Sequence, residues 1–120
     1  MHSVTVDPAR RLIHASLSGF FTPEEVARFA AAEQAAARSL GPGPFDLLVE
    51  TPGGMTQAQD VAAAFHTLAQ TAEVKASRIA VACEGSLLRL QLRRILTGDR
   101  VAIFENRHDA ECWLRPRVAA

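Results

Sequence analysis

The sequence has only two cysteines, Cys83 and Cys112, and it contains no CxxC pair. Neither a disulfide framework nor a paired-cysteine metal site can be built from them. The sequence also lacks any apolar run near the roughly 20 residues that a membrane span requires, and it has no N-terminal segment of signal-peptide type. We therefore expect a cytoplasmic protein with no membrane span.

An excess of charge of either sign is also missing. Lys and Arg number 13, and Asp and Glu number 13, so the formal net charge at pH 7 is zero. No overall electric field attracts a nucleic acid or an anionic membrane, and we expect neither as a partner. Hydrophobic residues make up 48% and charged residues 22% of the chain. This mixture in 120 residues predicts one globular domain over residues 1–120.

The first part of the chain predicts a hairpin and a helix. Residues 4–6 and 12–17 have strand patterns, joined by turn residues around Pro8. A helix is predicted from Pro23, because Thr22 and Glu25 can form a capping box in front of it. Gly41 and the proline after it end this helix, and Glu33 is the one polar interruption of its apolar face.

The remaining elements alternate regularly. Residues 45–50, 78–83 and 101–104 are apolar runs typical of buried strands. Helices are predicted after each strand: one opened by a second capping box at 56–59, one over 86–97, and one capped by Asn106 and ended by Pro116. The order ββαβαβαβα predicts an α/β fold. We expect a mostly parallel sheet of about five strands, helices on both faces, and an antiparallel strand at or near an edge.

Five segments in this order carry a family resemblance: LSGFFTPEE (17–25), RIAV (78–81), SLLRLQLRRIL (86–96), VAIF (101–104) and AECWL (110–114). Together they resemble the SpoIIAA-like branch of the STAS domain superfamily, bacterial proteins often described as STAS/SEC14 domain-containing. The resemblance covers essentially the whole chain. It implies a SpoIIAA-like (STAS) fold of successive βα turns without catalytic activity. It also implies a role in protein–protein regulation or in binding a small or lipid-like molecule.

The relatives that act as anti-sigma-factor antagonists carry a phosphorylated serine at the start of the helix after the third strand. This chain has residues 50–56 there, without the Asp-Ser-x-Gly pattern of those antagonists. A phosphate at a helix N-terminus would meet free amides and the positive end of the helix dipole. Thr51 and Thr56 are therefore the candidate phosphorylation sites. The alternative is that Thr56 only caps the helix and Thr51 is a loop residue.

The rest of this loop is the predicted surface for a ligand or a partner. Its residues are Pro52, Gly53, Gly54, Met55 and Gln57. The Gly-Gly pair could let an anionic group approach the backbone, or it could be a plain tight turn. The loop has neither GxxxxGK[ST] nor GxGxxG, so it lacks the parts that bind a nucleotide.

Polar residues crowd one face of the helix predicted over 86–97. They are Arg89, Gln91, Arg93 and Arg94. Such a face could bind a carboxylate, a phosphate or an acidic partner surface. The alternative is an ordinary solvated helix face.

Metal and catalytic patterns are not found in the sequence. His108 and Cys112 have ligand spacing on a helix, but no third or fourth ligand accompanies them, so we expect no metal and no cofactor. His14 and His66 have no evident partner. No nucleophile and base can be paired, and we therefore expect a protein that is not an enzyme.

Two functions follow from these observations. The first is a non-catalytic STAS-like domain that binds a protein partner, as an antagonist-like regulator, through residues 51–57. The alternative is a small-molecule or lipid carrier of the SEC14 (CRAL-TRIO-like) type, in which Ala62, Ala63 and Ala64 leave space against the sheet rather than only allowing close packing. A carrier needs a large apolar cavity and an interaction domain needs an exposed patch. Formation of a homodimer is left open.

Overall fold

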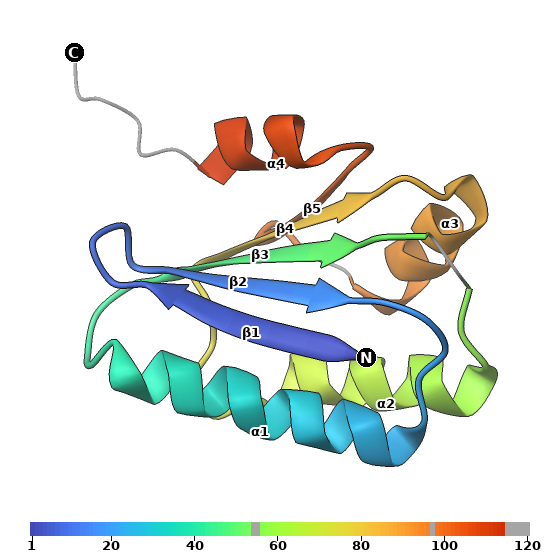
Figure 1. The fold of residues 1–120 in the computed structure, drawn as a ribbon, viewed down its shortest axis with the longest axis horizontal. Helices are drawn as coiled ribbons and strands as arrows, with labels where there is room; N and C mark the ends of the chain where they lie inside the picture. Colours follow the sequence, from blue (N-terminus) through green and yellow to red (C-terminus); the bar gives the residue numbers. More distant parts are fainter. Residues whose placement is uncertain (54–55, 97, 115–120) are drawn as a thin grey trace.

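A computed structural model of the chain describes residues 1–53, 56–96 and 98–114. Within these residues five strands and four helices follow one another in the predicted order (Figure 1). They are β1 (His2–Asp7), β2 (Leu12–Leu17), α1 (Pro23–Ser39), β3 (Asp46–Thr51), α2 (Gln59–Thr71), β4 (Arg78–Cys83), α3 (Ser86–Ile95), β5 (Val101–Phe104) and α4 (Arg107–Leu114). The predicted order ββαβαβαβα is confirmed.

The strands form one sheet in the order β1-β2-β3-β4-β5. β1 lies at an edge and pairs antiparallel with β2. The pairs β2–β3, β3–β4 and β4–β5 are parallel. The predicted α/β class, with a mostly parallel sheet and an antiparallel edge strand, is therefore confirmed.

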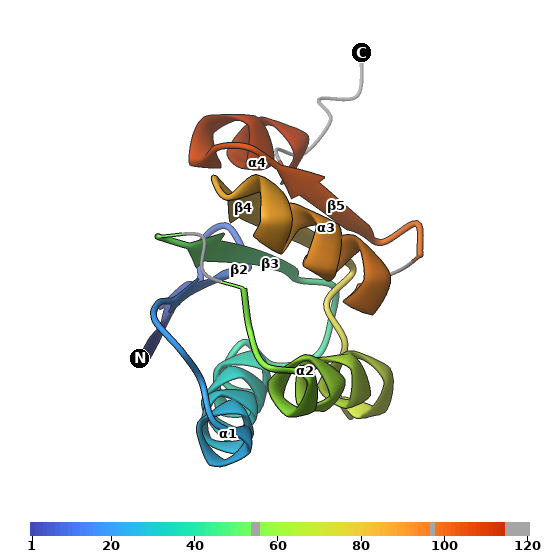
Figure 2. The ribbon, with the colours of Figure 1, turned by 90° about the vertical axis from the view of Figure 1, so that its right-hand side faces the viewer.

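The strand order decides where the helices lie. The connections through α1, α2 and α3 each lead to the neighbouring strand of the sheet, always in the same direction. Because such crossovers between parallel strands share one handedness, all three helices lie on the same face of the sheet. α4 follows the last strand and packs on the opposite face (Figure 2). Accordingly, Leu47 and Val49 of β3 pack in the core with α1 to α3, whereas Leu48 packs with Ala110 and Leu114 of α4.

The start of α1 matches half of the predicted capping box. The Thr22 hydroxyl accepts a hydrogen bond from the Glu25 amide at 3.2 Å, and Pro23 occupies the first turn. The Glu25 carboxylate does not bond back to Thr22. It lies 3.0 Å from the amino group of Met1, and the hydrogen bond from that group is the main cause that lowers the pKa of Glu25. α1 is thus tied to the edge strand at its first turn.

Arg11 organises the turn after α1, which the sequence did not indicate. Its guanidinium donates to the carbonyl oxygens of residues 40–44, at distances between 2.7 and 3.3 Å. Arg11 itself has a left-handed backbone, with φ of 48°. Gly41 also has a positive φ, of 74°, which glycine adopts at low cost, and it ends α1 as predicted.

The predicted start of α2 is wrong. The helix begins at Gln59, with Ala58 as its N-cap and no side-chain cap, so Thr56 does not form a capping box. The physical reason is that the backbone of Gln57 is hydrogen-bonded to α3 and cannot enter the helix. α3 ends at Ile95 because Leu96 is extended, and the predicted end at residue 97 lies outside the described residues, as does Pro116.

Candidate functional site

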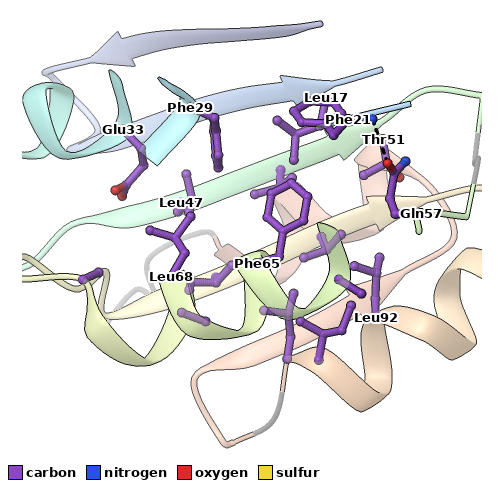
Figure 3. A pocket seen from close by; sticks show the side chains of 18 of the residues that line it. Leu17, Phe21, Phe29, Glu33, Leu47, Thr51, Gln57, Phe65, Leu68 and Leu92 are labelled. Atoms are coloured by element: carbon purple, nitrogen blue, oxygen red, sulfur yellow. Dashed lines mark hydrogen bonds between the residues drawn. The ribbon is translucent and has the colours of Figure 1, made fainter. Parts of the chain in front are cut away.

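An apolar cavity of about 140 Å³ lies between the sheet and the helices α1, α2 and α3 (Figure 3). Its floor is formed by strand residues that include Leu47, Val49 and Val81. Its roof includes Phe65 and Leu68 of α2 together with leucines of α3. A carrier requires such a space, whereas a domain that only presents a surface does not.

Phe65 stands in the middle of this cavity, where three aromatic rings meet. Its ring centre lies 5.7 Å from that of Phe21 and 6.3 Å from that of Phe29, and both pairs are tilted. The helix α2 nevertheless leaves space beside these rings, because Ala69 and Ala72 follow at helical spacing and fill little volume. Phe65 and Leu68 consequently remain only half-buried.

Glu33 and Gln57 lie at opposite ends of the cavity (Figure 3). Glu33 is only 7% exposed, and it is the polar interruption that the sequence placed on the inner face of α1. Its Oε2 accepts a hydrogen bond from Gln34 Nε2 at 2.6 Å. Burial raises the pKa of Glu33, and the hydrogen bond from Gln34 opposes this shift only in part. A carboxyl group that favours its neutral form therefore borders an apolar space.

A pair of hydrogen bonds joins α1 to the segment before β4 at this end. Gln34 Nε2 donates to the Val74 carbonyl at 2.9 Å, and the Val74 amide donates to Gln34 Oε1 at 3.0 Å. Lys75 and Arg100, both exposed, also line this end. Arg100 Nη1 donates to the carbonyl of Ala76 at 2.8 Å, which fixes the guanidinium beside this segment.

Gln57 forms the opposite end of the cavity, where its backbone and its side chain are hydrogen-bonded to other elements. Its amide and carbonyl pair with the side chain of Gln91 at 2.9 and 2.8 Å. Its own side chain accepts from the Phe21 amide at 2.9 Å and donates to the Gly19 carbonyl at 3.1 Å. The start of α1, the entry to α2 and the middle of α3 are thus held together at this end by two glutamines.

The predicted loop site is only partly accessible. Thr51 is the last residue of β3, is 8% exposed, and donates its hydroxyl to the Ala82 carbonyl at 3.2 Å. Thr51 is therefore a strand residue and not a loop residue, which was the alternative to a phosphorylation site. Thr56, Pro52 and Gly53 are exposed. The other two residues of the predicted surface, Gly54 and Met55, lie outside the described residues.

The predicted basic face of α3 divides into two parts. Arg89 Nη1 donates to the carbonyls of Cys83 and Glu84 at 2.9 and 3.0 Å, and Gln91 is bonded to Gln57. These two side chains hold the fold together and do not form a free surface. Arg93 and Arg94 are exposed, so of the four predicted partner-facing residues these two are the ones that stay accessible, and their role stays a prediction.

Polar groups on the other face of the sheet include His14, for which no partner was evident in the sequence. His14 Nε2 lies 2.8 Å from Glu50 Oε2, and Arg107 Nε lies 3.6 Å from Glu50 Oε1. His108 Nε2 and Cys112 Sγ are 3.7 Å apart on α4. Within the described residues no group of three or more His, Cys, Asp and Glu side chains is arranged to hold a metal ion.

In the sequence, only the alanines of one helix indicated a cavity. Of the three alanines noted there, Ala62 lines the cavity, Ala63 is exposed, and Ala64 packs beside the cluster of Phe21 and Val26. The hydrogen bonds that Gln34, Gln57 and Gln91 form with other elements join residues 34 to 40 positions apart, and no local pattern identifies such contacts.

Comparison of the chain with protein-family models, with curated proteins and with solved structures finds no match. Across the three described stretches, no helix combines the length and the apolar character needed to cross a membrane.

Proposed function

We propose that this domain binds a small apolar ligand in the cavity between the sheet and α1 to α3, and that it acts without catalysis. The cavity of about 140 Å³ is the observation that carries the proposal. An apolar cavity of roughly 150 Å³ is sufficient to bind a molecule of the size of benzene. Ligand binding would bury the apolar surface of Phe65, Leu68 and Leu92, which the fold leaves half-buried.

The polar groups of the lining support a binding role over a catalytic one. Thr51, Gln57 and Gln91 all hydrogen-bond to backbone groups, so they are occupied in holding the walls. Glu33 is accompanied in the lining by no nucleophile that contacts it among the described residues. Catalysis needs a nucleophile or a base within reach of a second reacting group.

The resemblance to SpoIIAA-like and SEC14-type proteins is part of this proposal. It is supported by the strand order β1-β2-β3-β4-β5, which is what successive βα turns produce. A cytoplasmic location is also proposed, and the two free thiols, Cys83 and Cys112, are consistent with a reducing compartment.

A pair of alanine variants tests the proposal. Ala69→Leu adds a side chain inside the cavity, whereas Ala63→Leu adds the same side chain on the exposed face of α2. We expect Ala69→Leu to lose binding of a dye that fluoresces in apolar sites and Ala63→Leu to retain it. Ala69→Leu should also raise the melting temperature, because filling a cavity stabilises a fold.

Two outcomes would count against a ligand cavity. One is equal dye binding by both variants. The other is a clear fall in the melting temperature of Ala69→Leu alone, since overpacking would mean that the space is already filled in solution. Mass spectrometry of small molecules extracted from protein purified from its native cells then identifies the ligand.

A second candidate function, binding of a protein partner, is favoured by one observation. Leu87 is 69% and Leu90 53% exposed on the outer side of α3, on the same helix as the exposed Arg93 and Arg94. Exposed leucines beside cations fit an apolar and acidic partner surface, or a second copy of this chain. The double variant Leu87→Glu/Leu90→Glu should fold normally but lose any self-association seen by sedimentation and any partner captured from cell extract.

A further inference from the structure

The end of the cavity at Glu33 has an unused hydrogen-bonding group. Glu33 Oε2 accepts from Gln34, and among the described residues no group bonds to Oε1. The side chain is 7% exposed and borders the cavity. Among the described residues only His2 Nδ1 is a fully buried polar side-chain atom without a partner, so Glu33 Oε1 keeps some accessible surface that a ligand atom can reach.

The charges at this end favour a ligand of one sign. Lys75 and Arg100 line the cavity here, and neither forms an ion pair with a described residue. The nearby cation Arg38 is already paired with Glu73, at 2.9 Å. Two unpaired cations against one buried carboxyl group attract an anionic group and oppose a cationic one.

The opposite end offers no comparable polar group. Gln57 and Gln91 use their amides in bonds to backbone groups, and the residues between the two ends are almost all apolar. A ligand that fits the whole cavity is therefore polar at one end only.

Building on the ligand-binding function proposed above, we infer that the ligand is an alkyl monocarboxylate. Its chain lies along the apolar walls, and its carboxylate lies at the Glu33 end, beside Lys75 and Arg100. The protonated Glu33 carboxyl group donates a hydrogen bond to the ligand carboxylate. Two ionised carboxylates could not form this bond, because neither would carry a proton to donate.

The test compares three ligands of equal chain length, octanoate, 1-octanol and octylamine, by calorimetry with the full chain. We expect octanoate to bind about tenfold more tightly than the other two ligands, because a charge-assisted hydrogen bond increases the affinity by about this factor. The variant Lys75→Gln/Arg100→Gln should lose this preference and keep its affinity for octanol. Arg93→Gln/Arg94→Gln removes the same charge from α3 and should keep the preference.

The outcomes separate this inference from the proposed function. If octanol binds as tightly as octanoate, or octylamine binds best, the inference is wrong while the apolar site stands. If none of the three ligands binds, or if Ala69→Leu does not weaken octanol binding, the proposed function is wrong as well.

The dependence of binding on pH tests the role of Glu33 separately. Octanoate stays ionised between about pH 6 and pH 8, because the ordinary carboxyl pKa is near 4.3. Its affinity should fall as the pH rises, because Glu33 must stay protonated to donate to the ligand carboxylate. Glu33→Gln retains a neutral donor, so it should still bind octanoate but without the pH dependence. An unchanged pH dependence in this variant would overturn the assigned role.

Other charged groups also lie near Glu33, and their effect on binding must be distinguished from that of Glu33. They are Lys75 and Arg100 in the lining, the Arg38–Glu73 pair, and His2 of β1, whose ring lies 6.0 Å from that of Phe29. All of these groups are intact in Glu33→Gln, so any pH dependence that remains in this variant is assigned to them and not to Glu33.

Discussion

Gln91 of α3 pairs with the backbone of Gln57 as an adjacent strand would. Its Oε1 accepts from the Gln57 amide at 2.9 Å, and its Nε2 donates to the Gln57 carbonyl at 2.8 Å. Gln34 forms the same two-bond arrangement with Val74 at the other end of the cavity. Glutamine amides thus fix both ends of α2, and the space beneath this helix persists because its ends are held in place.

Replacing Gln91 by Leu should therefore loosen the entry to α2. The variant removes the two hydrogen bonds between the Gln91 side chain and the Gln57 backbone, at a cost of about 1–3 kcal/mol in the free energy of unfolding. Urea denaturation measures this loss, and hydrogen exchange of the Gln57 amide should accelerate more than that of amides within β4. Gln70→Leu, on an exposed position of α2, is the matched control and should change stability little. Equal effects of the two variants would contradict the described contact.

The raised pKa of Glu33 predicts a specific dependence of stability on pH. Below the ordinary value of 4.5 the carboxyl group is protonated in both the folded and the unfolded chain, and it contributes no pH dependence. As the pH rises, the unfolded chain releases its proton first, so stability falls until the pH passes the folded-state pKa. Glu33→Gln cannot ionise, so its melting temperature should exceed that of the wild type by an amount that grows as the pH rises above 4.5 and levels off beyond the folded-state pKa. Glu84→Gln, at an exposed position, should show no such divergence.

The architecture could be predicted from the sequence because its signals are local. The strands at 78–83 and 101–104 have the predicted bounds, and Thr22 and Asn106 cap their helices as expected. Each signal depends on residues within one turn or one strand. Thr56 misled the prediction because its pattern is a good cap, but the contact between Gln57 and Gln91 prevents the helix from starting there.

The candidate site could be predicted much less well. A cavity forms where the side chains of neighbouring elements do not fill the space between them. A sequence does not show whether Ala69 packs against a neighbour or faces an empty space. Glu33 was visible as an interruption of an apolar face, yet Lys75 and Arg100, which line the same cavity, lie far along the chain. Arg89 and Gln91 have the composition of a surface, but long-range hydrogen bonds occupy them.

Arg78 should control the docking of α4. It donates to the carbonyls of Trp113 and Leu114 at 2.9 and 2.7 Å, pairs with Asp46 at 3.1 Å, and lies 5.5 Å from the centre of the Trp113 ring. Arg78→Met removes these contacts and leaves Asp46 unpaired, at a cost of about 2–4 kcal/mol. Because Trp113 is the single tryptophan, its fluorescence reports on α4 alone and should shift to longer wavelength. Arg93→Met should leave the emission unchanged.

At Arg11 the backbone conformation destabilises the fold, whereas the side chain stabilises it. We therefore expect an unusual ranking of the stabilities of variants at this position. The left-handed φ of 48° costs roughly 1–2 kcal/mol in any residue but glycine, while the guanidinium donates to five carbonyl groups of residues 40–44. Arg11→Ala loses the hydrogen bonds and keeps the strain, whereas Arg11→Gly loses the same bonds and relieves the strain. We therefore expect Arg11→Ala to be the less stable of the two by about 1 kcal/mol in thermal unfolding. Arg11→Lys keeps the charge but cannot reach all five carbonyls, so it should also fall below the wild type, while Arg10→Lys next to it should not. If the Ala and Gly variants were equally stable, the backbone at this turn would not be left-handed in solution.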